Sequence, residues 1–277
     1  MHGCTGRVTN RRGDKAMDQK KQKEVLILAT KAGKIMMRSG AEIYRVEDTI
    51  ERICRACGVE FVNVFAMPTG IFVSINNRDQ DDTVTYIRRI RSSETNLSKI
   101  SSVNNFSREF TTTDMTVEEG MKILDEIENG RKYPFWFREL AAALVTGCFS
   151  VIFGGGPPDF GVAFVAGAGC YMLSRFLEKY EINFFIRGFV CTAFASACAL
   201  TGEVLIPGVA YAHIVAGCIM LFVPGVAITN SIRDFLSGDM VSGLARMTEA
   251  LLIGISLAAG AGVMIKAWVL LGGAILW

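Results

Sequence analysis

The chain has 277 residues, of which 51% are hydrophobic and 20% are charged, and its formal net charge is +2 at pH 7. Basic and acidic residues are nearly matched and form no long block of one sign, which argues against a nucleic-acid partner held by a basic surface. Most of the charges lie in the first half, which excludes both a uniformly soluble protein and a bare bundle of membrane helices. We therefore predict an α+β soluble domain at residues 20–133, followed by an α-helical membrane domain at residues 134–277.

The soluble half shows helical and strand patterns in turn. Residues 1–19 are polar and lack the apolar core of a cleaved signal peptide, so we predict a disordered tail there. Apolar residues then recur at helical spacing, and two Val- and Phe-rich runs flank the turn Met67–Gly70, which predicts a β-hairpin. A capping box, Thr116 with Glu119, opens the last helix. The expected helices are 20–38, 42–57, 97–110 and 116–129, and the expected strands are 59–66, 71–75 and 83–91.

The soluble domain carries no recognisable catalytic constellation. The only histidine before the membrane half is His2, in the tail, and the soluble domain contains no phosphate-binding glycine loop or nucleophile motif. The pair Cys54 and Cys57 lies inside a helical pattern without a second metal-ligating pair, which favours a structural role. We predict that the protein is not an enzyme, that it uses no cofactor or metal, and that this domain serves in binding, gating or scaffolding.

The second half contains five apolar segments, which predict about five transmembrane helices. The fourth segment has 28 residues and would be about 42 Å long as one straight helix, so it must tilt, kink or break. Pro224 and Gly225 lie inside it, and such a break is tolerated in a membrane only where protein or a water-filled cavity satisfies the backbone. The segments are 135–153, 160–177, 184–202, 205–232 and 247–265.

Polar residues follow this break. Thr229, Asn230, Arg233 and Asp234 are three to five residues apart, so we expect them to share roughly one face of a helix. The chain is then loosened by glycines before a last charged stretch, in which Glu249 can pair with the arginine one turn earlier or gate a substrate. An ordinary cytoplasmic loop is the alternative to a functional segment. The candidate site residues are Pro224, Gly225, Asn230, Arg233, Asp234, Asp239, Arg246 and Glu249.

Lysine and arginine lie in alternate connections of the membrane half. By the positive-inside rule, we predict a multi-pass protein of the cell's inner membrane with a cytoplasmic N-terminal domain and an extracytoplasmic C-terminus. Residues 267–277 either extend the fifth helix or lie at the outer interface. His213 lies within the fourth segment, as a hydrogen-bonded structural residue or as a proton carrier.

Two blocks of sequence resemble the threonine/serine exporter family. The first is SGAEIYRVEDTI at 39–50 with FAMPTGIFVSI at 65–75, and the second is VPGVAITNSIRDFLSGDMVSGLARMTE at 223–249. The resemblance covers nearly all of the chain after Met17. It places Gly40, Glu42, Arg45, Glu47, Pro68 and Thr69 in the family's cytoplasmic motif, and the residues after Pro224, Gly238 among them, in its transport segment.

The resemblance also implies partners and substrates. Single-chain members carry about ten spans, so this chain resembles the larger half of the split type, whose partner is a smaller membrane subunit of about five spans; a homo-oligomer is the alternative. The implied function is a subunit of a secondary, proton-coupled exporter of small carboxylate-bearing metabolites, either threonine and serine or succinate. The alternatives are a membrane-anchored cytoplasmic sensor or enzyme, and a structural subunit that supports a separate conducting partner.

The expected chemistry follows from the substrate's carboxylate. A carboxylate in a dehydrated site needs a cation or oriented amides. Arg233 is the first candidate for that cation, with the unwound backbone at Pro224 and the side chain of Asn230 as hydrogen-bonding groups. Asp234 or Asp239 is expected to bind the ammonium group of an amino acid or to carry the coupled proton.

Overall fold

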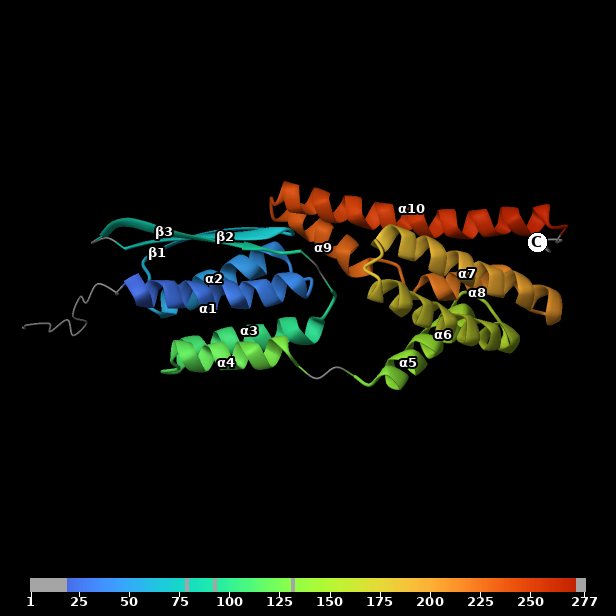
Figure 1. Ribbon diagram of the computed structural model, residues 1–277, viewed down its shortest axis with the longest axis horizontal. Helices are drawn as coiled ribbons and strands as arrows, with labels where there is room; N and C mark the ends of the chain where they lie inside the picture. Colours follow the sequence, from blue (N-terminus) through green and yellow to red (C-terminus); the bar gives the residue numbers. More distant parts are fainter. Residues whose placement is uncertain (1–18, 78–79, 92–93, 131–132, 273–277) are drawn as a thin grey trace, which may run out of the picture. The chain divides into compact units, whose positions relative to one another are not determined.

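The computed structural model describes residues 19–77, 80–91, 94–130 and 133–272 (Figure 1). It divides into two compact units, residues 1–130 and 131–277. The predicted tail at 1–19 lies outside the described residues except for Gln19, which already belongs to the first helix.

The first unit has three layers. Its sheet is antiparallel with the order β1-β2-β3, and Figure 1 shows α1 and α2 covering one face of this sheet, with α3 and α4 on the far side of those helices. The predicted hairpin and third strand are both present. The elements are α1 (Gln19–Arg38), α2 (Ile43–Ala56), β1 (Phe61–Met67), β2 (Gly70–Asn77), β3 (Gln80–Arg89), α3 (Leu97–Thr112) and α4 (Val117–Glu128).

The apolar stripe of α2 explains how this unit folds. Ile43, Val46, Ile50 and Ile53 are all 0% exposed, and they recur every three or four residues along one helix face. The inward residues of β2 pack in the same core, because alternate residues of a strand point to the same face. Full burial of one such side chain contributes about 1.5–3 kcal/mol, so the stripe fixes the position of α2 on the sheet.

The predicted capping box at the start of α4 is confirmed. The Glu119 N–H donates to Thr116 Oγ1 at 3.3 Å, and the Thr116 N–H donates to Glu119 Oε2 at 2.9 Å. The hydrogen bond from the Thr116 backbone, followed by the one from its hydroxyl, lowers the pKa of Glu119. The helix therefore begins where the sequence predicts.

The second unit is entirely helical within the residues that the structure describes, and four of its helices are long and apolar enough to cross a membrane. These are α5 (Phe135–Ile152), α6 (Pro157–Lys179), α7 (Phe184–Leu205) and α10 (Met240–Leu270). The expected count of about five is not confirmed, because the fourth apolar segment forms two short helices, α8 (Tyr211–Ile219) and α9 (Gly225–Leu236). Of the C-terminal stretch 267–277, residues up to Leu270 extend α10 and 273–277 lie outside the described residues.

Small residues bring the long helices together, as expected in a membrane where close backbone packing replaces the hydrophobic effect. Between α5 and α6, Thr146 Oγ1 donates to the carbonyl of Ala163 at 2.8 Å and lies against Gly167. Between α7 and α10, Gly188 lies against Ser256 and Gly260 lies against the carbonyl of Phe189. Later residues of α7 contact later residues of α10, so the two helices run parallel.

The parallel packing leaves the first half of α10 beyond α7. The Ser256 hydroxyl donates to the carbonyl of Phe185, in the first turn of α7. Residues 240–255 precede this contact and extend about 24 Å at 1.5 Å per residue. Figure 1 shows α9 lying along this part of α10, past the end of α7. We call α9 and residues 240–255 the α9–α10 hairpin.

Candidate functional site

The interruption of the fourth segment lies directly before the candidate residues. The helix α8 is nine residues long, or about 14 Å, which is about half of a bilayer core of roughly 30 Å. It packs among α5, α6 and α7, and its Gly217 lies against the backbone of α5. Pro224 then caps α9 and Gly225 is its first residue. The chain therefore stops being helical at 220–224 and resumes as the first arm of the hairpin.

The four polar residues of α9 do not share one face, contrary to the expectation from their spacing. Asn230 and Asp234 are buried, whereas Thr229 and Arg233 are exposed. Each pair is separated by four residues and therefore forms its own stripe, and the two stripes are offset by one residue, or about 100° around the helix. The 230/234 stripe faces α10, and the 229/233 stripe faces away from it.

A buried ion pair joins the two arms of the hairpin. Arg246 Nε lies 3.3 Å from Asp234 Oδ2, and the two side chains are 9% and 0% exposed. Glu249, the partner that the sequence suggests for Arg246, is exposed on α10 instead. Removal of one partner would leave the other charge buried without compensation, which is strongly destabilising.

Close packing around the turn explains why Asp234 and Arg246 meet. Gly238 has a φ of +91°, a conformation that favours glycine, and the N–H of Asp239 donates to the carbonyl of Asp234 at 2.9 Å. Asp239 caps α10 through its backbone position, without a hydrogen bond from its side chain. One turn into α10, Gly243 lies against the ring of Phe235, and a Cβ there would be 2.8 Å from that ring. The chain thus reverses tightly, with the arms close enough for the ion pair.

The residues of the first sequence motif, at positions 40, 42, 45, 47, 68 and 69, have structural contacts in the first unit. Gly40, with a φ of +84°, ends α1, and the buried Glu42 is the N-cap residue of α2. Arg45 Nε lies 3.4 Å from Glu42 Oε2 and donates to the Tyr44 hydroxyl at 3.3 Å. The pKa of Arg45 is raised, first by the hydrogen bond with Tyr44 and then by the charge of Glu42.

The remaining motif residues connect α2 to the hairpin of the sheet. Glu47 Oε1 accepts a hydrogen bond from the Ala66 N–H at 2.8 Å. Pro68 and Thr69 form the β1–β2 turn, and the Thr69 carbonyl accepts from the Ile90 N–H at 2.9 Å. In the structure, the motif therefore holds α1, α2 and the strands in place.

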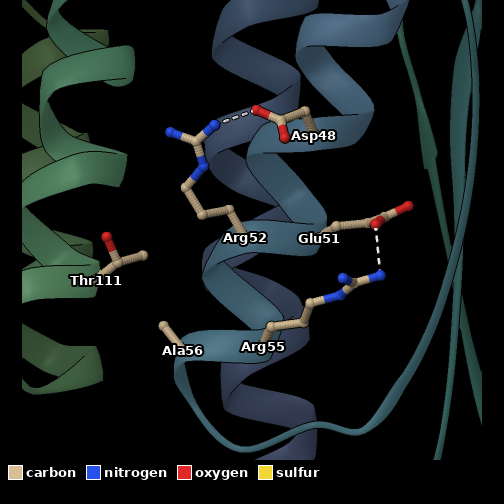
Figure 2. Close-up of a pocket in the computed structure, with 6 residues that line it drawn as sticks. All are labelled: Asp48, Glu51, Arg52, Arg55, Ala56 and Thr111. Atoms are coloured by element: carbon tan, nitrogen blue, oxygen red, sulfur yellow. Dashed lines mark hydrogen bonds and ion pairs between the residues drawn. The ribbon is translucent and has the colours of Figure 1, made fainter.

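A shallow pocket in the first unit lies between α2 and α3 (Figure 2). Its charged lining residues form ion pairs along α2, Arg52 with Asp48 and Arg55 with Glu51, the latter at 3.0 Å. Pairs four residues apart on an exposed helix face stabilise the helix and leave little charge for a ligand. The pocket therefore does not compete with the α9–α10 hairpin as a candidate site.

The two cysteines of the C-x-x-C pattern are free thiols. Burial raises the pKa of Cys54 to about 12 and also raises the pKa of Cys57. A reactive or metal-binding thiol needs the opposite shift, and this supports the structural interpretation of the pair. Among the described residues, no group of three or more His, Cys, Asp or Glu side chains is placed to hold a metal ion.

One polar cluster is absent from the sequence-based list. At the other end of the second unit, the buried Asp159 at the start of α6 lies close to His213 in the first turn of α8. The two residues are 54 positions apart, and only the fold brings them together. The available signal is an aspartate at the third position of a helix that begins with Pro-Pro after three glycines, where its side chain can accept a backbone N–H at the helix start.

Comparison with known proteins identifies the family to which this arrangement belongs. The sequence pattern that describes the threonine/serine exporter family matches residues 27–268. The chain belongs to the threonine/serine exporter family. The match includes the sequence blocks on which the resemblance rests and confirms it. The buried ion pair and the interrupted fourth segment are therefore features of a membrane protein of an exporter family.

The relatives of this exporter-family chain differ in length. The threonine/serine exporter of Corynebacterium glutamicum is 26% identical over 248 residues, which are 87% of this chain and 51% of that protein. A protein of Escherichia coli named "Probable succinate transporter subunit YjjP" is 25% identical over 261 residues, which are 92% of this chain and 99% of that protein. The chain thus spans about half the length of the exporter and nearly all of the subunit. No solved structure matches it.

Proposed function

We propose that the chain is a subunit of a proton-driven secondary exporter of small carboxylate-bearing metabolites, and that the Asp234–Arg246 pair of the α9–α10 hairpin belongs to its substrate site. The observation that carries the proposal is this buried pair of opposite charges directly after an interrupted apolar segment. Half-helices next to unwound backbone are a common way to build substrate sites in transporters. The exposed Arg233 on α9 supplies a second cation, which attracts the substrate's carboxylate.

The ion pair favours a zwitterionic substrate. An amino acid carries one ammonium and one carboxylate group, so it can take Asp234 and Arg246 as separate partners and leave neither charge alone. A dicarboxylate such as succinate offers only anions, so it would leave Asp234 buried without a counter-charge, which costs several kcal/mol. Within the two substrate classes of the family, we therefore propose threonine, serine or a similar small amino acid.

The same geometry supports a second subunit or a second copy of the chain. Large apolar side chains of the hairpin point outward, among them Leu236, Met240, Val241 and Leu244, which are all more than 60% exposed. Apolar surface of this kind requires lipid or protein to cover it. We propose a smaller membrane subunit of about five spans as the cover, an inner-membrane location, a cytoplasmic N-terminal domain and an extracytoplasmic C-terminus.

The decisive experiment removes both charges at once. The double variant Asp234→Asn with Arg246→Gln keeps polar side chains of similar shape, and replacement of a whole buried pair is often tolerated by the fold. In proteoliposomes that contain the chain and its partner, we expect efflux of labelled threonine and serine to be lost while the protein still inserts. Arg175→Gln is the matched control, because Arg175 forms an exposed ion pair with Glu178 at 3.8 Å.

The outcomes separate the alternatives. Efflux of threonine at the wild-type rate in the double variant would exclude the ion pair from the substrate site. Efflux by the partner alone, unaffected by removal of this chain, would make this chain a structural subunit. Faster efflux of succinate than of either amino acid would overturn the argument from zwitterion charge.

A further inference from the structure

Four chain segments meet around Asp159, at the end of the second unit opposite the α9–α10 hairpin. The carboxylate is 3% exposed. Its Oδ2 accepts a hydrogen bond from the Gly156 N–H at 2.7 Å, and its Oδ1 accepts one from the Ala210 N–H at 2.8 Å. Two backbone donors and the N-terminal end of α6 suit a carboxylate anion. Asp159 therefore fastens the loop before α6 to the loop before α8.

His213 connects this buried carboxylate to the surroundings. Its Nδ1 lies 3.6 Å from Asp159 Oδ2, and its side chain is 32% exposed. Within the described residues Nδ1 makes no hydrogen bond. On the other side of the ring, Nε2 faces Gly154, where a Cβ would be 3.6 Å away. The imidazole thus lies between a group that is closed to water and the outside of the unit.

Few positively charged side chains lie in the helices around the Asp159–His213 pair. Residues 139–174 and 188–232, which supply most of α5, α6 and α7 and all of α8, contain no lysine or arginine. A second carboxylate, Glu203 on α7, accepts the N–H of Tyr211 at 3.3 Å, and Lys266 lies on α10, which packs against α7. Histidine is the side chain that ordinarily gains or loses a proton between pH 5 and pH 8.

The position of His213 links this chemistry to the candidate substrate site. It lies in the first turn of α8, whose last turn is followed by the non-helical residues 220–224 and then by α9. Besides the contact at His213, hydrogen bonds from the Ala210 and Tyr211 N–H groups to Asp159 and Glu203 hold the start of α8. We expect a tighter contact between His213 and Asp159 to act on α8 and, through it, on the interruption and on α9, which carries Asp234.

We propose that Asp159 and His213 form the proton-binding site of this exporter subunit. This proposal rests on the proposed function. A proton from the aqueous phase adds to the lone pair of the neutral imidazole. The resulting imidazolium donates its Nδ1–H to Asp159 Oδ2, and the gap of 3.6 Å closes to an ion pair. The one bond formed is the new N–H bond of the imidazolium, and loss of the proton breaks that bond and restores the open contact.

Direct proton binding can be measured without transport, because His2 and His213 are the chain's two histidines. In the His2→Gln background, isotope-labelled histidine gives one imidazole signal from the full chain in detergent. We expect this signal to titrate between pH 5 and pH 8, and Asp159→Asn to weaken proton binding by about tenfold or more. A signal that does not titrate in this range, or that titrates identically in the Asp159→Asn variant, overturns the proposal.

Transport supplies the second measurement and covers the case in which Asp159→Asn does not fold. Efflux of labelled threonine from proteoliposomes is measured at pH 5.5 and pH 7.5 on the side opposite the hairpin. We expect His213→Gln to remove the difference between the two rates, and Tyr211→Phe, which deletes only a hydroxyl bonded to Ser196, to retain it. An unchanged difference in His213→Gln overturns the proposal. A wild-type chain that exports none of threonine, serine and succinate contradicts the proposed function instead, and the titration of His213 then still decides proton binding.

Discussion

Substitution of Gly217 by alanine should separate α8 from α5. A Cβ at Gly217 would lie 2.5 Å from the Thr146 carbonyl oxygen and 2.9 Å from the Ser150 nitrogen, whereas ordinary contacts begin at 3.4 Å. The obstructing atoms are backbone, so α8 must move away by about 3.4 − 2.5 = 0.9 Å or remain overpacked. Overpacking costs about 1–3 kcal/mol, and better helix propensity returns up to about 1 kcal/mol. We expect a net destabilisation of up to about 2 kcal/mol.

Gly262 on α10 is the matched control, because a Cβ there meets no atom within 4 Å. Gly262→Ala should gain the propensity term alone, so the two variants should differ by about 1–3 kcal/mol, the overpacking term itself. Thermal unfolding in detergent can be followed with a thiol-reactive fluorophore, because Cys170, Cys191 and Cys218 are buried until the unit opens. Equal melting temperatures for Gly217→Ala and Gly262→Ala would refute the close approach of α8 to α5.

Three further predictions concern single residues. Arg233→Ala should abolish threonine efflux without loss of membrane insertion, since Arg233 is the exposed cation of α9, one residue before Asp234. Efflux at the wild-type rate would exclude that role. The lowered pKa of Glu119 means that its capping contribution is complete above its unfolded value of about 4.5 and is lost as the pH falls through the lower folded value. Amide protection at 117–120 should fall in that acid range in the wild type and stay constant in Glu119→Gln. Cys54, with a pKa of about 12, should resist iodoacetamide at pH 8 in the folded chain, and rapid modification would contradict its burial.

The sequence was sufficient where one periodic pattern decides the structure. The stripe of α2 has a single apolar face, so its packing could be predicted, and Pro224 correctly marked the point before which the fourth segment breaks. Periodicity failed in α9, because the 229/233 and 230/234 stripes are equally polar and only the packing of α10 selects the buried one. The stretch before Met247 looked like a loop because of its glycines and charges, yet it is helical, since Gly243 lets α10 approach Phe235.

Contacts between distant segments were beyond the reach of any local pattern. Asp159 and His213 lie on different helices, and nothing in either neighbourhood names the other. The partner of Arg246 was missed for a related reason. Glu249 is nearer in sequence, but it lies on the same helix and points outward, whereas Asp234 reaches Arg246 across the hairpin turn.

The helix α10 runs without a break from Met240 to Leu270, although it contains four glycines. It therefore behaves as a stiff rod that carries Arg246 near one tip and reaches past the bundle's middle at the other. A displacement of the hairpin end of α10 is therefore transmitted along the whole helix. The contacts of Ser256 and Gly260 with α7 are the point about which α10 can tilt. If α10 tilts about its contact with α7, its two ends move in opposite directions.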